Sequence, residues 1–315
     1  MRYTRIFWKV RHPKHSVPMK HYRLIFTSDC TQDCVFCLAK DDPRVRLSFP
    51  EVVALLKQQR ARGAELLSID GGEPTKVPYF PSLITKCLAL GFKKIAVKTN
   101  GYGFADKRFS REVLEGRQDV IKLYLSLHGH NKNLHDRLSR VKGSFAVAMR
   151  AIRNVVNLDA SIVTNIVVCS ENFRFLKQYI DVLVQARVSK TIFLFIVPEG
   201  NALRNSSLIP ALPEVIPYVQ DAVDYANIKG VYPALTFFPF CALDPYYISY
   251  AAEAYMPDRF KDPEAFSARR HRPPQCLRCA CYRLCPGVWE AYYTLHSFCF
   301  KPFPVRRRSV GSRHK

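Results

Sequence analysis

Short runs of β-branched or aromatic residues alternate with amphipathic segments from about residue 21 to residue 235. This order is typical of repeated βα units that build a parallel sheet. The predicted strands are 22–27, 65–69, 94–98, 121–126, 161–168 and 191–197. The predicted helices are 50–62, 81–90, 144–156, 173–186 and 214–226. Such βα units predict an α/β fold, either a (β/α) barrel, partial or complete, or an open doubly wound sheet.

After Val231 the pattern breaks down into aromatic, Pro-rich and Cys-rich sequence, which predicts a small appended domain held together by a metal centre. The expected division is a basic N-terminal arm 1–20, a barrel 21–235, a Cys-rich domain 236–300 and a basic tail 301–315. Apolar stretches fall short of the roughly 20 residues that a membrane helix needs, and the first residues lack an apolar signal core. We expect a soluble cytoplasmic protein without a membrane partner.

The composition excludes a disordered chain, because 48% of the 315 residues are hydrophobic. The charge balance adds a second expectation. Lys and Arg total 48 against 26 Asp and Glu, a net charge of +22, and no acid precedes Asp29 or follows Glu290. Such a field favours polyanions, so weak nucleic-acid binding through the basic termini is one prediction. A solvated basic surface with no such partner is the alternative.

The chain holds 11 cysteines, and most of them fall in two groups. The first group is Cys30, Cys34 and Cys37; the second is Cys276, Cys279, Cys281 and Cys285; the rest are Cys87, Cys169, Cys241 and Cys299. A disulfide framework usually belongs to a short secreted chain. Metal or iron-sulfur ligation in a reducing compartment explains the grouping better.

The first group directly follows the first predicted strand, so its loop lies at the C-terminal end of the sheet. In (β/α) barrels this face carries the active site. Three thiolates within eight residues can bind three irons of a [4Fe-4S] cluster. Because the usual protein site has four cysteine ligands, one iron is left open. The spacing taken alone also suits a zinc knuckle.

A further motif follows each of the next three predicted strands, and together these motifs favour the cluster over the zinc knuckle. They are Gly71-Gly72-Glu73-Pro74, Thr99-Asn100-Gly101 and Ser126-Leu127-His128-Gly129. With the CxxxCxxC loop and its aromatic Phe36, the order of motifs resembles the radical S-adenosylmethionine (radical SAM) superfamily. The resemblance implies a partial (β/α)6 TIM-type barrel with a small Cys-rich C-terminal extension.

The resemblance also implies the cofactors and their contacts. A [4Fe-4S] cluster would bind SAM through its open iron and cleave it to a 5′-deoxyadenosyl radical, which abstracts hydrogen from a substrate. The residues implied to contact SAM or shape its site are Gly71, Gly72, Glu73, Pro74, Thr99, Asn100 and Ser126. The glycines would admit the methionine part of SAM, and Glu73 would accept from its ammonium group. No residue is assigned to catalysis, and His128 is expected to be structural.

The second group resembles part of the auxiliary-cluster domains called SPASM and twitch. The match is incomplete, so we expect one auxiliary [4Fe-4S] cluster. Three ligands would be Cys276, Cys279 and Cys285, and the fourth is open between Cys241, Cys281 and Cys299, with Cys241 preferred because it follows the end of the barrel pattern. A structural zinc site is the competing interpretation, since four cysteines suit both metals.

These residues predict a radical SAM enzyme that acts on a peptide, as a maturase, or on a small metabolite. A reducing partner such as ferredoxin or flavodoxin would supply the electron. Two alternatives stay open: the same chemistry on RNA or a nucleotide, and a non-enzymatic iron-sulfur or nucleic-acid-binding protein. The fold cannot choose the substrate.

Overall fold

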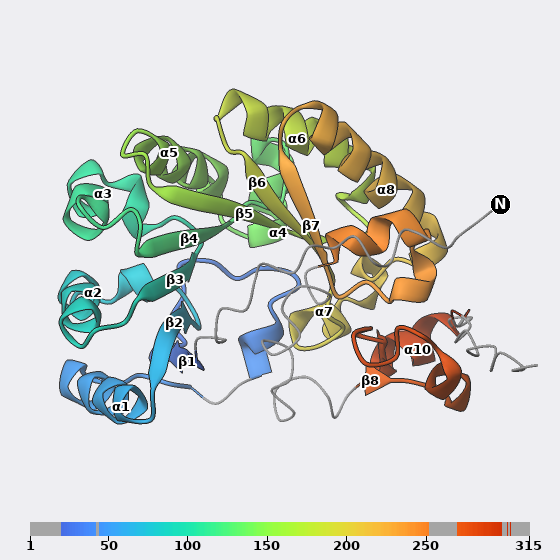
Figure 1. The fold of residues 1–315 in the computed structure, drawn as a ribbon. Coiled ribbons are helices and arrows are strands. Elements are labelled where there is room, and N and C mark those ends of the chain that lie inside the picture. Colours follow the sequence, from blue (N-terminus) through green and yellow to red (C-terminus); the bar gives the residue numbers. More distant parts are fainter. Residues whose placement is uncertain (1–19, 42–43, 252–269, 298–300, 302, 304–315) are drawn as a thin grey trace, which may run out of the picture.

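The computed structural model describes residues 20–41, 44–251, 270–297, 301 and 303. Seven parallel strands form one sheet in sequential order (Figure 1). They are β1 (Lys20–Ile25), β2 (Ala64–Asp70), β3 (Lys94–Thr99), β4 (Ile121–Ser126), β5 (Ser161–Val168), β6 (Lys190–Phe195) and β7 (Tyr232–Thr236). Within this sheet β1 and β7 are the two edges and do not pair with each other. The sheet is therefore an open arc, which confirms the partial barrel.

The seventh strand is an addition to the six that the pattern predicts. It is short, and its second residue is Pro233, which has no N–H to donate. Proline within a sheet is confined to edge strands and strand ends, and β7 is an edge strand. A proline-containing run of five residues is a weak strand pattern, so only the pairing with β6 reveals it.

Helices cover the convex side of the arc (Figure 1). They are α1 (Phe49–Ala61), α2 (Phe80–Ala89), α3 (Lys107–Leu114), α5 (Ser144–Val156), α6 (Leu176–Gln185) and α8 (Leu212–Ile228). The five predicted helices are confirmed to within a few residues, and α3 and α4 (Lys132–Ser139) are additions. These two helices have eight residues each and start at side-chain caps, Asp106 and Asn131. No helix in the described part of the chain is long and apolar enough to cross a membrane.

The two faces of the sheet differ in polarity, and β4 shows the difference. Ile121, Leu123 and Leu125 are buried in the core, while the alternate residues of the strand are half-buried on the concave face. Charged groups also occupy that face: Asp70 Oδ2 accepts from Arg23 Nε at 2.9 Å and from Lys98 Nζ at 2.6 Å. The interior of the arc is thus a polar surface below the strand ends.

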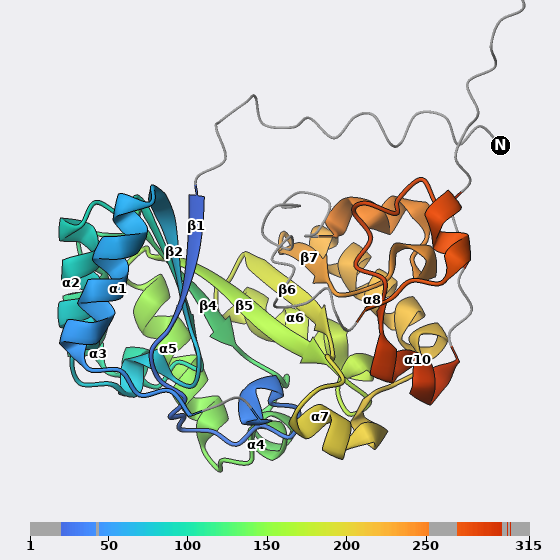
Figure 2. The same cartoon turned by 90° about the horizontal axis from the view of Figure 1, so that it is seen from below.

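The Cys-rich segment lies beside the β6–β7 side of the arc (Figures 1 and 2). Its strands β8 (Arg270–His271) and β9 (Val288–Trp289) pair antiparallel, and α10 (Glu290–His296) follows. Tyr292 of α10 is 1% exposed and packs edge-on against Phe195, with ring centroids 5.5 Å apart. Its hydroxyl accepts from the backbone N–H of Leu212 at 2.7 Å. This side chain therefore attaches the segment to the barrel.

Replacing Tyr292 by Phe should lower the free energy of unfolding by about 1–3 kcal/mol, because the buried Leu212 N–H loses its acceptor. Urea unfolding measures this change. Tyr232→Phe is the matched control, since Tyr232 is 67% exposed. Equal stability of the two variants would show that the Tyr292 hydroxyl does not contribute to docking.

Candidate functional site

The loops that follow the strands meet at one edge of the sheet. Because all seven strands are parallel, their carboxyl ends lie on the same side. Figure 2 shows the loop after β1, α4 and α7 (Asn201–Arg204) gathered along the lower edge. The four sequence motifs follow β1, β2, β3 and β4, so the fold brings them to this edge.

The three cysteines of the first group share one site on the loop after β1. Cys30 is exposed, and Cys34 and Cys37 are partly buried. Burial, with a smaller effect of the neighbouring Cys30 and Cys37 thiols, raises the pKa of the Cys34 thiol to about 12. Three thiols that oppose one another's ionisation need positive charge to become thiolates together. Bound iron supplies such charge, so this donor set fits a cluster.

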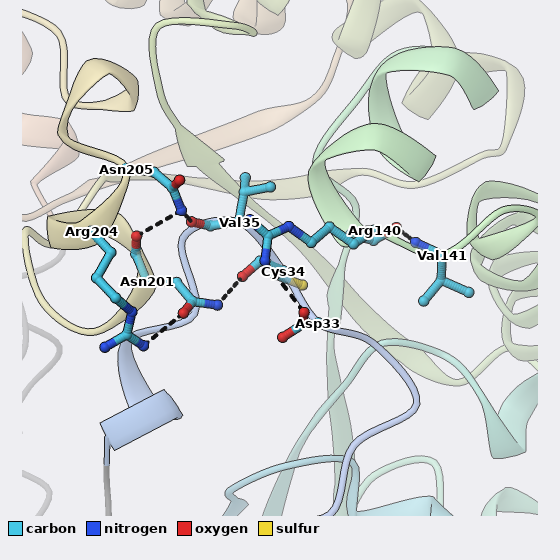
Figure 3. A network of polar contacts seen from close by, with 9 residues as sticks. Asp33, Cys34, Val35, Arg140, Val141, Asn201, Arg204 and Asn205 are labelled. Atoms are coloured by element: carbon cyan, nitrogen blue, oxygen red, sulfur yellow. Dashed lines mark hydrogen bonds and ion pairs between the residues drawn. The ribbon is translucent and has the colours of Figure 1, made fainter.

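Helix α4 holds one side of the cysteine loop. The backbone N–H of Val35 donates to the carbonyl of Leu138 at 2.9 Å, and that of Asp33 donates to the carbonyl of Ser139 at 3.1 Å. Arg140, directly after the helix, pairs with the Asp33 carboxylate at 3.3 Å (Figure 3). The loop has no ladder of its own, so these contacts satisfy its backbone.

Helix α7 holds the other side, and the sequence analysis missed it. Asn201 Nδ2 donates to the carbonyl of Cys34 at 2.9 Å, and Asn205 Nδ2 donates to the carbonyl of Val35 at 3.0 Å (Figure 3). Arg204 Nη2 donates to Asn201 Oδ1 at 2.8 Å and orients the amide. One feature of the sequence points to a role for α7: this polar segment directly follows the sixth predicted strand.

Gly200 allows α7 to approach the cysteine loop. Its φ is +55°, and a Cβ at this position would collide with the carbonyl oxygens of Cys37 and Leu38. The close approach lets the backbone N–H of Asn201 donate to the Cys37 carbonyl at 2.9 Å. Glycine is thus required both by conformation and by space.

Gly71 and Gly72 serve a similar purpose on the opposite side. A Cβ on either residue would collide with backbone of the chain that leads into Cys30, at Thr27 for Gly71 and at Asp29 for Gly72. The Gly72 N–H donates to the Thr27 carbonyl at 2.9 Å, and the Glu73 N–H donates to the Asp29 carbonyl at 2.7 Å. The structure therefore gives these glycines a packing role; their approach to SAM stays a prediction.

Glu73 is fully buried and ties the loops after β2 and β3 together. Its Oε1 accepts from the hydroxyls of Thr75 at 2.6 Å and Thr99 at 2.8 Å, and its Oε2 accepts from the Asn100 N–H at 2.7 Å. Burial raises the pKa of this carboxyl, while the hydrogen bonds oppose that shift. Glu73 has a structural role here, and its predicted contact with the SAM ammonium stays a prediction.

The other predicted SAM residues lie around the same edge. Asn100 Nδ2 donates to Thr31 Oγ1 at 2.9 Å and lies 3.6 Å from Cys30 Sγ. Ser126 is half-buried at the end of β4 and pairs in register with Asn165 of β5. Asn165 Oδ1 is buried and accepts no hydrogen bond from the described residues. An orphaned buried acceptor fits a polar ligand at this edge.

Pro74 is buried and starts the short turn Pro74–Lys76 that leads away from the strand end. The buried hydroxyl of Thr99 donates to Glu73 Oε1, as described above, and accepts from the Gly101 N–H at 2.9 Å. Both residues therefore shape the loops, and contacts of either with SAM stay predictions.

His128 supports the cysteine loop from beneath. Its ring meets Phe36 edge-on, with centroids 4.8 Å apart. Its Nδ1 accepts from the Val167 N–H at 3.3 Å, so the proton of the neutral ring resides on Nε2. Burial lowers the pKa of His128 to about 3, as does the neighbouring His135, so the ring stays neutral. This arrangement agrees with the structural role expected from the sequence.

The second site is a small cavity in the Cys-rich segment. Its lining includes Cys241, Cys276, Cys279 and Cys285, the four residues preferred from the sequence. Cys281 is buried at 7% exposure outside this lining. Cys299 lies outside the described residues. The fold thus brings the preferred fourth cysteine beside the other three.

Cys285 receives two backbone hydrogen bonds inside this cavity. The N–H groups of Phe240 and Gly287 donate to its sulfur at 3.3 and 3.4 Å. Burial raises the pKa of Cys285 to about 11, while the two donors and the Arg272 guanidinium lower it. Donors aimed at a sulfur stabilise its thiolate form, the form that binds metal.

Zinc and an iron-sulfur cluster require different arrangements of the four cysteines. All ligands of one zinc ion lie within about 2.3 Å of it, whereas each cysteine of a cubane binds its own iron. Among the residues the structure describes, no three His, Cys, Asp or Glu side chains are placed to hold a single ion. An iron-sulfur cluster at this site stays a prediction, with structural zinc as the alternative.

Comparison with known proteins gives this geometry a family. The sequence profile of the radical SAM superfamily matches residues 24–181, half of the chain. The chain belongs to the radical SAM superfamily. Membership implies a [4Fe-4S] cluster and SAM at the edge described above.

Two curated radical SAM relatives match part of the chain. The mycofactocin maturase MftC of Mycolicibacterium smegmatis is 32% identical over 163 residues, which are 49% of this chain and 38% of the relative. A GTP 3′,8-cyclase of Mannheimia succiniciproducens is 28% identical over 151 residues, 42% of this chain and 43% of the relative. The chain thus spans less than half the length of either relative.

Among solved radical SAM structures, SuiB of Streptococcus suis bound to S-adenosylmethionine superposes with a TM-score of 0.61 at 16% identity. The match covers 88% of this chain and 74% of SuiB. The superposition therefore extends beyond residues 24–181, the region that the superfamily profile matches. At this identity the likeness concerns the fold.

The contacts by which α7 holds the cysteine loop after β1 can be tested with Asn201→Asp and Asn205→Asp. Each change keeps the shape but replaces an N–H donor by a carboxylate oxygen facing a carbonyl. One lost hydrogen bond costs about 1 kcal/mol, so each variant should lose iron to a chelator roughly fivefold to tenfold faster. Asn157→Asp is the control, because Asn157 uses only its oxygen, toward Arg187. Iron release as slow as in this control would mean that α7 does not hold the loop.

Glu73→Gln separates the two roles of this residue. The glutamine amide places an N–H₂ group against the hydrogen-bond donors Thr75, Thr99 and Asn100, so the free energy of unfolding should fall by about 1–3 kcal/mol. If Glu73 also binds the SAM ammonium, SAM affinity should fall about tenfold or more, since charge-assisted hydrogen bonds are worth roughly 1.5–3 kcal/mol. Glu65→Gln, which changes a surface ion pair with Lys93, controls for charge. Unchanged SAM affinity with reduced stability would leave Glu73 a structural residue only.

Proposed function

We propose that this protein is a radical SAM enzyme that modifies a peptide, with one auxiliary [4Fe-4S] cluster. The observation that carries the proposal is the contrast between its two cysteine sites. The loop after β1 offers three cysteines, and the second cavity is lined by four. A four-iron cluster on three cysteines keeps one iron free for SAM, whereas four cysteines leave no iron free.

When bound, the first cluster supplies the electron that cleaves SAM to methionine and a 5′-deoxyadenosyl radical. The residues of this chain hold and orient that site. Helices α4 and α7 position the loop, and Asn100 lies beside Cys30. The half-buried concave face of the sheet would receive the substrate beneath the strand ends, where Arg23 and Lys98 face Asp70.

The auxiliary cluster would serve as an electron conduit. With Cys241, Cys276, Cys279 and Cys285 as its ligands, it has no open coordination position for a substrate. The Cys285 sulfur receives two backbone N–H donors, and hydrogen bonds to cluster sulfurs tune the reduction potential. Electron transfer is therefore better supported for this cluster than ligation of the substrate.

A peptide is the preferred substrate for two reasons. The relative MftC is named a maturase, and a structure of SuiB bound to its precursor peptide SuiA also superposes on this chain, with a TM-score of 0.57. The net charge of +22 also suits a peptide rich in acidic residues. A nucleotide substrate is the second candidate, because a GTP 3′,8-cyclase is among the relatives.

The first test changes Cys30, Cys34 and Cys37 together to Ser. The wild-type protein should hold about eight irons after anaerobic reconstitution, and the variant about four. The variant should release no 5′-deoxyadenosine, because no open iron remains to bind SAM. Production of 5′-deoxyadenosine at the wild-type rate would refute the proposed function.

The second test compares Cys241→Ala with Cys281→Ala. The first change removes a cysteine of the cavity and should abolish the auxiliary signal in electron paramagnetic resonance. The second removes a buried cysteine outside it and should leave that signal unchanged. The reverse result would assign the fourth ligand to Cys281. Mass spectrometry of acidic peptides and of GTP after SAM cleavage then decides between the two substrates.

A further inference from the structure

A basic surface surrounds the four-cysteine cavity. From Arg270 through Trp289 the chain has four arginines, Arg270 included, and no acid. Arg272, Arg278 and Arg283 are exposed, and we call them the arginine surface. Arg272 lines the cavity itself. Each of the other two is within two residues of a cavity-lining cysteine, a separation of at most about 7 Å along the chain.

Exposed leucines are interspersed with these charges. Leu277 is 68% exposed and Leu284 is 43% exposed, and both are on the same cysteine-bearing segment as the arginines. Leu277 follows Cys276 directly, and Leu284 precedes Cys285 directly. Apolar side chains with a charged rim are typical of protein docking sites.

Among the residues that the structure describes, acidic groups do little to neutralise this surface. The nearest acids along the described chain are Asp244 and Glu290, and each is engaged with a neighbour, Gln220 and His271 respectively. A backbone hydrogen bond from Lys301 to Cys241 adds a further exposed cation beside the cavity. The charged side chains that the structure describes at the mouth of the cavity are therefore mainly basic.

We propose that the arginine surface docks a small acidic one-electron carrier protein, which delivers its electron to the four-cysteine site. This inference rests on the proposed function in one respect, that the site holds a redox-active cluster. In the step the carrier is oxidised by one electron and the auxiliary cluster is reduced by one electron. No bond is made or broken, and no proton moves.

Charge and distance both support this assignment. Electron transfer slows steeply with distance, so a donor must dock next to the cluster that it reduces. Complementary charge speeds such encounters and lets a small, transient interface suffice. A nucleic acid fits less well, because single strands stack on aromatic side chains, and the exposed apolar side chains here are leucines.

The test uses the reconstituted holoprotein and a reduced, acidic [2Fe-2S] ferredoxin as the probe. The double variant Arg278→Glu and Arg283→Glu, which leaves the cavity-lining Arg272 in place, should slow reduction of the holoprotein at least tenfold in stopped-flow absorbance at low salt. The wild-type rate should also fall with ionic strength, and the variant should lose this dependence. Iron content and the number of electrons accepted from dithionite should not change.

Lys107→Glu and Arg108→Glu on α3 form the matched control. They make the same change in net charge on exposed residues, and α3 lies at the far end of the molecule from β8 and α10 (Figure 1). This control should be reduced at close to the wild-type rate. Equal slowing of the two double variants would overturn the proposal, because net charge alone would then explain the effect.

Two other outcomes would also overturn it. The first is tight binding of a short single-stranded RNA that is lost in the arginine variant, with ferredoxin reduction unaffected. The second is a zinc ion at the four-cysteine site. Failure of the proposed function has a different signature, because a protein that does not cleave SAM can still accept electrons through the arginine surface. Conversely, SAM cleavage at the normal rate with dithionite, together with equal rates of ferredoxin reduction in the wild type and the arginine variant, would reject only the docking site.

Discussion

The cysteine loop after β1 depends on its neighbours for its conformation. It forms no strand ladder, so its backbone carbonyls and N–H groups need partners from elsewhere, because unpaired buried groups cost free energy. Asn201, Asn205 and the end of α4 supply those partners, and Gly200 makes the approach possible. The segments that follow β4 and β6, more than 60 residues apart along the chain, thereby position the backbone that carries the three thiols.

The same edge is stabilised from the other side by a buried carboxylate. Glu73 accepts from Thr75, Thr99 and Asn100, which links the loops after β2 and β3. Its burial would disfavour a charge, and the hydrogen bonds offset that cost. Residues that look like ligand contacts in the sequence therefore also hold the loops of this edge together, and the two roles must be separated by experiment.

The two cysteine sites differ in how the fold supports them. The first lies on a loop clamped by the barrel, and the second lies between the loop after β7 and the β8–β9 hairpin, with Tyr292 joining this segment to the barrel. One site offers three cysteines, and the other is lined by four. The proposed function rests on this difference, which would assign SAM cleavage to the first site and electron supply to the second.

The sequence by itself determined the βα order, the position of both cysteine groups and the motif at each strand end, because periodicity and spacing are local properties of the chain. It could not reveal β7, whose short proline-containing run becomes a strand only by pairing with β6. It also could not show that Cys241 rather than Cys281 lines the second cavity, or that Asn201 reaches Cys34 from 167 residues away. Those contacts arise from the curvature of the sheet and the docking of α10, since only the folded chain brings such distant residues together.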